Sequence, residues 1–425
     1  MSEIKEIPKH WQIKKLGDVC DKITKGGTPT TYGFAFVSSG VNFIKIENVE
    51  HGKVNLSTIK TFITEEAHNY QRKSMLEEND LLFSIAGTIG ETCLIKREYL
   101  PANTNQALAI LRGYIKTFKP QFLTYQLSSS ISQYVKLKAR GGAMNNISLE
   151  DLKGIELAVP PLPEQQAIVA KIEELLSELE NGKQQLLTAQ QQLKVYRQSL
   201  LKWAFEGKLT NKKVKDGELP KGWKWVKNKE LLKYVTSGSR DWKQYYSNKG
   251  SRFVRTQDIN SNKLDLANAA YMDLPEKVEG KRSLIEEGDI LMTITGANVG
   301  KVAVVDFPIE DAYVSQSVAL LKYQDKRITK FLWYFFQAQG FGKSFIDKLV
   351  YGVGRPVLSL ENMREVDVIS CPIEDQQEII NELESKLTVC DKIEETISQS
   401  LQQAETLRQS ILKQAFEGKL ININS

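Results

Sequence analysis

The stretch RQSLLKWAFEGKL at Arg197–Leu209 returns near the end of the chain as RQSILKQAFEGKL at Arg408–Leu420. Gln165-Gln166 returns at the same spacing as Gln376-Gln377, and the residues between these anchors align without a gap. Each copy follows a much longer region of mixed composition. The repeat therefore predicts two copies of one unit, a globular domain followed by a long helix. A duplication of this kind suggests a protein that performs one task at two places.

Weaker similarities extend the repeat into the globular regions. Pro8–Trp11 resembles Pro220–Trp223, and NDLLFSIAGTIG from Asn79 resembles GDILMTITGANVG from Gly288. NQALAIL from Asn105 likewise matches SQSVALL from Ser315. The order and spacing agree, but few residues are identical. We therefore expect the two globular domains to share a fold while most of their surface has diverged.

Composition places the chain among ordinary soluble proteins. Hydrophobic residues at 41% and charged residues at 26% allow real cores, and 425 residues suggest two to four domains. The net charge of +5 permits an acidic partner without requiring one. Four cysteines without a C-x-x-C pair, and three histidines, argue against zinc fingers and a disulfide framework. No apolar leader or 18-residue apolar run occurs, so a cytoplasmic protein without membrane contact is expected.

Each globular region carries a mixed pattern. Asp80–Ile85 and Asp289–Thr295 have the apolar character of short buried strands that end in a glycine turn. Phe122–Leu137 and Ile328–Val350 have helical periodicity. The sequence therefore predicts an α+β protein, in which each globular region is an α/β domain with a curved, mostly antiparallel sheet.

The long helices have start signals, an apolar seam and stop signals. Prolines at 160, 161, 163 and 372 precede them, and Gly207 and Gly418 stand where a left-handed C-cap is expected. Apolar residues recur at steps of three and four, which predicts a coiled-coil seam. The seam positions are Ile168, Ile172, Leu175, Leu179, Gly182, Leu186, Ala189, Leu193, Tyr196 and Leu200, then Ile379, Leu383, Leu387, Cys390, Ile393, Ile397, Ala404, Leu407 and Ile411.

The predicted domain boundaries follow from these signals. They are a first globular domain at 1–160, a helix at 161–207, a linker at 208–218, a second globular domain at 219–371, a helix at 372–420 and a tail at 421–425. If the second helix returns along the first, the pair is antiparallel. We then expect the globular domains at opposite ends of the pair, an approximate two-fold axis and a nearly circular chain.

Motifs of known catalytic chemistry are missing from the sequence. It contains no N-P-P-Y methyltransferase loop and no H-E-x-x-H zinc motif, and GFGKS at Gly340–Ser344 lacks the first glycine of a phosphate loop. All three histidines lie in the first domain, whereas a duplicated enzyme should duplicate its catalytic groups. We therefore expect no catalytic and no metal-binding residue. A coiled-coil adaptor that holds two proteins, and an enzyme with an unrecognised site, remain alternatives.

Polar loops at matching positions of the two domains are suited to DNA. Glycine lets the backbone approach phosphate, serine and threonine donate to it, and Arg, Asn or Gln can pair with base edges. The alternative is that these are ordinary solvated loops. The candidates in the first domain are Lys25, Gly26, Gly27, Thr28, Thr30, Thr31, Tyr32, Lys45, Asn48, Arg140, Gly141, Asn145 and Asn146. Those in the second are Ser237, Ser239, Arg240, Lys243, Arg255, Gln257, Tyr351 and Arg355.

The chain resembles the specificity subunit of type I restriction–modification systems over essentially its full length. The resemblance rests on GGTP at Gly26–Pro29, NQAL at Asn105–Leu108, VPPLPEQQAIV at Val159–Val169, and the two copies of AFEGKL. The second copy departs from the pattern, because SGSR replaces GGTP and CPIEDQQ replaces PPLPEQQ.

The resemblance implies two target-recognition domains, each of which reads one half of a bipartite site in double-stranded DNA. The helices would form an antiparallel spacer of roughly 63 Å, or about 18 base pairs as an outer limit. They would dock two modification subunits, which carry S-adenosylmethionine, and restriction subunits, which use ATP and Mg²⁺. This chain itself would carry no cofactor. The expected docking residues are Gln165, Gln166, Arg197, Phe205, Gln376, Gln377, Arg408 and Phe416.

Overall fold

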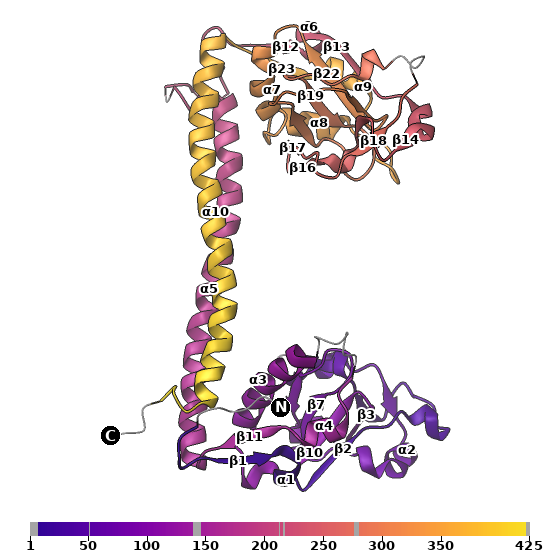
Figure 1. The fold of residues 1–425 in the computed structure, drawn as a ribbon, viewed down its shortest axis with the longest axis vertical. Helices are drawn as coiled ribbons and strands as arrows, with labels where there is room; N and C mark the ends of the chain where they lie inside the picture. Colours follow the sequence, from indigo (N-terminus) through magenta and orange to yellow (C-terminus); the bar gives the residue numbers. More distant parts are fainter. Residues whose placement is uncertain are drawn as a thin grey trace. The chain divides into compact units, whose positions relative to one another are not determined.

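The computed structural model describes residues 7–50, 52–138, 146–211, 213–215, 217–275 and 280–421, without the side chains at 50, 130–138, 240, 241 and 243. The chain divides into two compact units. Unit 1 comprises residues 1–186 and 399–425, and unit 2 comprises residues 187–398. Each unit contains one globular head together with parts of both long helices (Figure 1). We call residues 7–160 head 1 and residues 219–371 head 2.

Head 1 is built on a four-stranded antiparallel sheet with the strand order β2-β10-β7-β8. A second sheet has the order β6-β3-β9, with β3 and β9 parallel, and two further strand pairs are β1-β11 and β4-β5. The strands are β1 Gln12–Lys15, β2 Lys22–Lys25, β3 Val41–Ile44, β4 Val49–Glu50, β5 Lys53–Val54, β6 Phe62–Ile63, β7 Leu81–Ser84, β8 Thr92–Leu94, β9 Ala102–Thr104, β10 Leu108–Arg112 and β11 Glu156–Val159.

The main sheet of head 1 is buried on both faces. Successive side chains of a strand point to opposite faces. Accordingly Leu81 and Phe83 of β7 pack with Phe122, whereas Leu82 packs with Ile44 in a separate cluster. The apolar run that the sequence shows here is therefore a strand covered on both sides. The helices of the head are α1 Leu16–Val19, α2 Glu65–Tyr70, α3 Pro120–Lys138 and α4 Leu149–Lys153.

Head 2 repeats this plan, as the sequence repeat predicted. Its main sheet has the order β13-β22-β19-β20, which matches β2-β10-β7-β8, and β15 pairs in parallel with β21 as β3 does with β9. The strands are β12 Lys224–Lys227, β13 Leu232–Ser237, β14 Tyr246–Ser247, β15 Ser251–Val254, β16 Ile259–Asn260, β17 Lys263–Leu264, β18 Ala270–Met272, β19 Ile290–Thr293, β20 Val302–Val304, β21 Ala312–Val314, β22 Val318–Tyr323 and β23 Asp367–Ser370.

The helical periodicity of Ile328–Val350 corresponds to two helices with a break between them. The segment forms two helices, and the helices of head 2 are α6 Asn228–Leu231, α7 Thr329–Phe335, α8 Gly342–Leu349 and α9 Leu360–Glu365. Gly340 adopts φ +83° in the break, and Ser344 Oγ accepts a hydrogen bond from its N–H. At Gly342 a Cβ would lie 2.6 Å from the Phe335 carbonyl oxygen, so the turn needs glycine there. Helical periodicity alone did not reveal this turn, because both arms carry aromatic residues.

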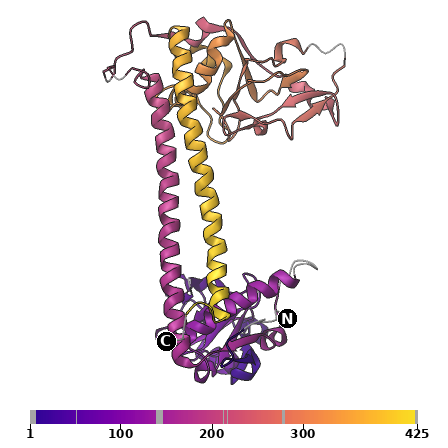
Figure 2. The same ribbon diagram turned by 60° about the vertical axis from the view of Figure 1, so that its left-hand side comes forward.

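The two long helices are α5 Leu162–Phe205 and α10 Ile373–Phe416. In unit 1 the first part of α5 packs with the last part of α10, since Ile168 and Ile172 share a core with Leu412 and Phe416. In unit 2 the last part of α5 packs with the first part of α10. Within each unit the two helices are therefore antiparallel (Figure 2). No helix in the described ranges is long and apolar enough to cross a bilayer.

The seam between the long helices buries fewer positions than the heptad pattern predicted. Tyr196, Ile393 and Leu407 are 43%, 44% and 50% exposed, so their assignment to the seam is wrong. An α-helix turns once in about 3.6 residues, so positions three or four residues from the central row lie to either side of it. Where the contact is narrow, these flanking positions stay in solvent. Buried positions recur every seven residues along α10, at Leu383, Cys390, Ile397, Ala404 and Ile411.

The repeated AFEGKL motif attaches the end of each long helix to a head. Gly207 and Gly418 adopt φ +74° and +69°, the left-handed conformation expected at a helix C-terminus. A Cβ would lie 2.2 Å from Pro220 Cγ at the first glycine and 2.3 Å from Pro8 Cγ at the second. The motif therefore recurs because the end of α5 packs on the entry of head 2, and the end of α10 packs on the entry of head 1.

The start of each long helix is fastened by a tryptophan. Trp11 Nε1 donates to Glu164 Oε1 over 2.8 Å, and Trp223 Nε1 donates to Asp375 Oδ2 over the same distance. Each acceptor lies in the first turn of its helix, where a negative charge is favoured by the helix dipole. The Pro-Lys-x-Trp segment of each head therefore contacts the end of one long helix and the start of the other.

Candidate nucleic-acid interface

The first glycine loop, Lys25–Gly33, follows β2 and is fixed by its backbone. At Gly26 a Cβ would lie 2.0 Å from the Thr104 carbonyl oxygen, so no other residue fits. Gly27 N donates to that same oxygen over 3.2 Å, and Thr28 Oγ1 donates to Gln106 Oε1. Lys25, Thr30, Thr31 and Tyr32 are exposed. The loop thus presents polar side chains on a backbone held against the end of β9.

The second glycine loop, Thr236–Tyr246, uses the same framework despite its different sequence. At Gly238 a Cβ would lie 1.9 Å from the Val314 carbonyl oxygen, and Gly238 N donates to Ser315 O over 3.2 Å. Ser239 is exposed and Ser237 is half-buried, whereas the side chains of Arg240 and Lys243 lie outside the described atoms. Gly238 therefore takes the place of Gly26.

The surroundings of the two loops differ in chemistry. In head 1, Asn103 contacts His68 Nδ1 and donates to Ser74 Oγ over 2.9 Å. The buried Gln71 Nε2 beside it has no hydrogen-bond partner among the described residues. In head 2 the position of Asn103 is taken by Tyr313, as the strand registers show, and Gly280 leaves room for its ring. These residues were not recognised from the sequence, although they lie next to the matching NQAL and SQSV strands.

Two of the predicted DNA contacts form hydrogen bonds within their own head. Asn48 is 3% exposed, its Oδ1 accepts from Lys45 N, and its Nδ2 donates to Thr58 O, so this prediction is wrong. Arg255 donates to Asp258 and to Asn268 O, but its side chain is 27% exposed, so it remains a candidate. The aligned positions form caps of short 3₁₀ helices, Ile46–Asn48 and Thr256–Asp258.

The other residues predicted near these caps remain candidates. Lys45 is half-buried and lies 3.5 Å from Glu47 Oε1, while Gln257 is exposed.

A further pair of loops lies beside the glycine turns that follow β7 and β19. Isolated bridges join Ala86 to Asn146 in head 1 and Thr295 to Val357 in head 2. Asn146, Tyr351 and Arg355 are exposed. The predicted contacts Arg140, Gly141 and Asn145 lie outside the described residues.

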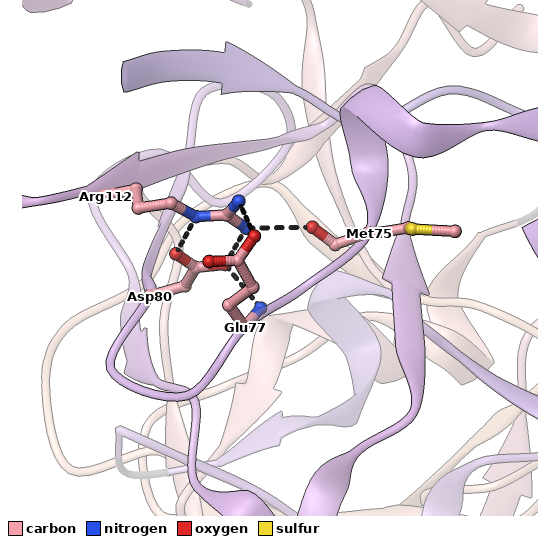
Figure 3. Close-up of polar contacts among 4 residues, drawn as sticks. All are labelled: Met75, Glu77, Asp80 and Arg112. Atoms are coloured by element: carbon pink, nitrogen blue, oxygen red, sulfur yellow. Dashed lines mark hydrogen bonds and ion pairs between the residues drawn. The ribbon is translucent and has the colours of Figure 1, made fainter. Parts of the chain in front are cut away.

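A buried ion pair links β10 to the turn before β7 (Figure 3). Arg112 donates to both carboxylate oxygens of Asp80, over 2.7 and 2.6 Å, and to Met75 O over 3.0 Å, and it also contacts Glu77. The hydrogen bonds to Asp80 raise the pKa of Arg112 above its ordinary value. The Asp80 carboxylate is thus paired with the guanidinium of Arg112 in the same head, and such a pair is typical of a structural role.

Head 2 holds the same turn with a lysine. Lys322 Nζ lies 2.9 Å from Asp289 and 3.1 Å from Glu286. Burial opposes the charge of Lys322, but the hydrogen bonds and charges of these two carboxylates raise its pKa above the ordinary value. Within the described ranges, no three His, Cys, Asp or Glu side chains gather in a way that could hold a metal ion.

Several residues predicted to dock partners are buried or engaged within the chain. Gln165 accepts from Lys119 N and donates to Thr117 O and Pro160 O, which fastens the start of α5 to head 1. Phe205 packs in the core of head 2, and Phe416 packs on Phe122. For these three residues the docking prediction is wrong, because a completely or largely buried side chain has no surface to offer a partner.

The other predicted docking residues fall into two groups. Gln376 is buried and donates to Cys371 O, and Arg197 pairs with Asp391 and Glu394 of α10. Gln166, Gln377 and Arg408 are exposed.

The family described as type I restriction modification DNA specificity domain matches residues 8–189 and again residues 220–403. The chain belongs to this family. The two matches coincide with the duplication, because each spans one head and the beginning of the long helix that follows it.

Named relatives are similar over most of the chain. The EcoBI specificity subunit of Escherichia coli is 26% identical over 418 residues, which cover 92% of this chain and 84% of the relative. The MjaVIII specificity subunit of Methanocaldococcus jannaschii is 23% identical and covers 97% and 94%.

Two solved structures share the fold. A chain from a type I restriction–modification assembly matches with a TM-score of 0.76 at 20% identity and covers 97% of this chain and 99% of its own length. The HsdS subunit of Thermoanaerobacter tengcongensis matches with a TM-score of 0.60 at 19% identity and covers 97% and 98%.

Proposed function

We propose that this chain is the DNA-recognition subunit of a type I restriction–modification complex, in which each head reads one half of a bipartite site. The observation that carries the proposal is the contrast between the two glycine loops. Gly26 and Gly238 hold both loops on the same strand framework, while the neighbouring side chains differ. A shared backbone with different polar and aromatic groups is suited to two readers of different short sequences.

The catalytic steps belong, in this proposal, to partner subunits. Two modification subunits supply S-adenosylmethionine, and restriction subunits supply ATP and Mg²⁺, so this chain is not an enzyme. Two features support this division. The duplicated carboxylates Asp80 and Asp289 each contact an internal cation, and the histidines are confined to the first head.

The long helices set the spacing of the half-sites and dock the partners. Their exposed apolar side chains support docking, since apolar groups gathered on a protein surface often mark a contact with another protein. In unit 2 these are Leu187, Val195, Tyr196, Trp203, Val389 and Ile393. Tyr196 and Trp203 also contact each other, with ring centroids 6.4 Å apart.

Methylome sequencing of cells with and without this protein tests the proposal. The expected result is an adenine-methylated motif made of two short specific halves separated by a fixed unspecific spacer, present only in cells that make the protein. The proposal fails if the methylated motifs of the two cell types are identical, or if the protein-dependent motif is one uninterrupted sequence.

A binding assay separates this function from that of a protein adaptor. If several phosphates are neutralised, the DNA affinity of the assembled complex falls by a factor of about 10³–10⁵ between 50 and 200 mM salt. If this chain were an adaptor that never contacts DNA, the complex would bind DNA weakly and with equal affinity whether or not the methylated motif is present.

A further inference from the structure

The two heads are proposed to read different bases, but the phosphate backbone that each head meets is chemically the same. Contacts to phosphate position a protein on the duplex and carry no sequence information, whereas contacts to base edges do. Surface chemistry that recurs in both heads is therefore suited to phosphate, and chemistry that differs is suited to bases. This distinction rests on the proposed function and identifies residues that the sequence repeat did not single out.

A dibasic turn recurs at the same place in both heads. It consists of Arg72 and Lys73 in the 3₁₀ helix Arg72–Ser74, and of Lys281 and Arg282 in the 3₁₀ helix Lys281–Ser283. All four side chains are exposed, and none forms an ion pair with any residue that the structure describes. Arg112 and Lys322, by contrast, each form an ion pair with a buried carboxylate of their own head.

The backbone of the turn is held identically in the two heads. The buried Ser74 donates through Oγ to Gln71 O over 3.0 Å, and the buried Ser283 donates to Gly280 O over 3.2 Å. Just after the turn, Leu76 N donates to Ala102 O over 2.9 Å, and its counterpart Ile285 N donates to Ala312 O over 2.8 Å. The two cationic pairs are therefore presented on the same rigid turn.

The turn adjoins the glycine loop in each head. It packs against β2 in head 1 and against β13 in head 2, and these are the strands that lead into the two loops. In head 1, Gln71 Oε1 lies 3.6 Å from the position of a Cβ on Gly27. In head 2, Gly280 packs on the ring of Tyr313, the neighbour of Val314, whose carbonyl oxygen lies against Gly238. Each dibasic pair is thus next to a loop that is proposed to meet DNA.

We infer that Arg72–Lys73 and Lys281–Arg282 are equivalent binding sites for the phosphates of double-stranded DNA, one in each head. They anchor a half-site without reading it. The order of the two residues supports this assignment, because Arg-Lys in head 1 becomes Lys-Arg in head 2. A point charge on a phosphate tolerates this exchange, whereas a forked contact of arginine with guanine does not.

Recurrence by itself does not identify a phosphate site. Lys9 and Lys221 also recur and are exposed, but they follow Pro8 and Pro220, which pack on the ends of the long helices. They carry the same charge next to the ends of the long helices. They therefore provide matched controls for the dibasic turns.

The test measures DNA affinity of the complex assembled with its methyltransferase subunits, between 50 and 200 mM salt. Two duplexes of equal length are used, one with the methylated bipartite motif and one with both halves scrambled. The variants are R72Q/K73Q in head 1 and K281Q/R282Q in head 2, with K9Q and K221Q as controls. Thermal unfolding checks that each variant folds, and R72K/K73R tests whether charge alone suffices.

Each glutamine pair should make the slope of log affinity against log salt less steep by about two, or about one per residue. The affinity loss should be the same factor on both duplexes, so the preference for the motif is unchanged. The lysine–arginine exchange and the controls should keep the wild-type slope. If a glutamine pair unfolds, the single variants R72Q and K73Q should each change the slope by about one.

The inference would be overturned if a glutamine double variant kept the wild-type slope of log affinity against log salt. It would also be overturned if such a variant lost affinity only for the duplex with the motif. Failure of the proposed function is a separate outcome. In that case the wild-type complex itself would bind the two duplexes equally, whatever the variants do.

Discussion

At the residue scale, one structural task is solved with different side chains in the two heads. Arg112 forms two hydrogen bonds to Asp80, whereas Lys322 reaches Asp289 and Glu286 with a single ammonium group. Both arrangements close the same turn, which precedes β7 in head 1 and β19 in head 2. The repeat therefore retains a buried carboxylate and a cation, but not the identity of the cation.

Removing the buried carboxylate should destabilise head 1 strongly. The Asp80 side chain is fully buried, so Asp80→Ala leaves the partly buried charge of Arg112 without its main partner. The expected loss is about 3–5 kcal/mol of unfolding free energy, measured by denaturant titration. Glu77→Gln is the control, because Glu77 is 63% exposed, and it should cost less than about 1 kcal/mol. Equal effects of the two substitutions would contradict this account.

Two glycines, one within α5 and one just after its end, should respond to alanine in opposite directions. Gly207→Ala places a Cβ against Pro220 and forces a left-handed conformation, so it should cost at least about 1–2 kcal/mol. Gly182 lies within α5, and a Cβ added there would meet no atom within 4 Å. Gly182→Ala should therefore raise the free energy of unfolding by about 0.5–1 kcal/mol. Thermal unfolding of both variants checks the sign. A stabilised Gly207→Ala would show that the contact with Pro220 is not rigid.

Asn48 shows why polar residues in a loop are a weak guide to a binding site. Asn48 and Asp258 occupy matching positions of the repeat, three residues after Lys45 and Arg255. Both side chains are buried and accept a hydrogen bond from a backbone N–H three residues earlier. Asn and Asp serve equally well in this capping role. The sequence could not distinguish a cap from a base contact, because exposure depends on the packing of the whole head.

At the element scale, the long helices were predictable from local signals. They were predicted at 161–207 and 372–420, and they span Leu162–Phe205 and Ile373–Phe416. Proline before the first turn and glycine after the last act through the local backbone, so their effect is visible in the sequence. The break between α7 and α8 depends instead on close packing at Gly342, and it was not predicted.

The narrow seam predicts different responses from neighbouring positions of α5. Leu193→Asp puts an unpaired charge into the buried row and should cost about 3 kcal/mol or more, with loss of complex assembly. Tyr196→Asp changes an exposed side chain of the same helix and should cost less than about 1 kcal/mol. Chemical unfolding compares the two. Similar losses of stability would mean that both positions lie in the contact.

Lengthening the helices should lengthen the DNA spacer if they act as a ruler. One heptad inserted after Gly182 and a matching heptad in α10 add about 10.5 Å, or roughly three base pairs. The methylated motif of cells that make the variant should keep both half-sites and gain a longer spacer. An unchanged spacer, in a complex that still methylates, would remove the helices from this role.

At the scale of the whole molecule, each compact unit is assembled from segments that are distant in the sequence. Unit 1 needs residues 399–425 as well as residues 1–186. Phe416 packs on Phe122, and Gly418 lies against Pro8, so the last helix completes the first unit. Unit 1 is therefore built from two segments of the chain, and α10 supplies part of its core.

Exchanging one head should transfer one half-site. Replacing residues 1–160 by the equivalent segment of a relative should change a single half of the methylated motif, because the loops of head 2 are attached only to strands of head 2. Methylome sequencing of cells with the hybrid gives the result. The matched control is exchange of residues 219–371, which should change only the other half. A hybrid in which both halves change would show that the heads do not read independently.

The sequence by itself determined the duplication, the shared fold of the heads, and the starts and ends of the long helices. These features depend on repeated residues and on local backbone preferences of proline and glycine, which act over a few neighbours. Only the tertiary structure decided which polar residues are free to meet a ligand. It buried Asn48, Gln165 and Phe205, and it left the two dibasic turns exposed beside the glycine loops. Burial and pairing arise from contacts between residues that are far apart in the chain, so no local pattern reveals them.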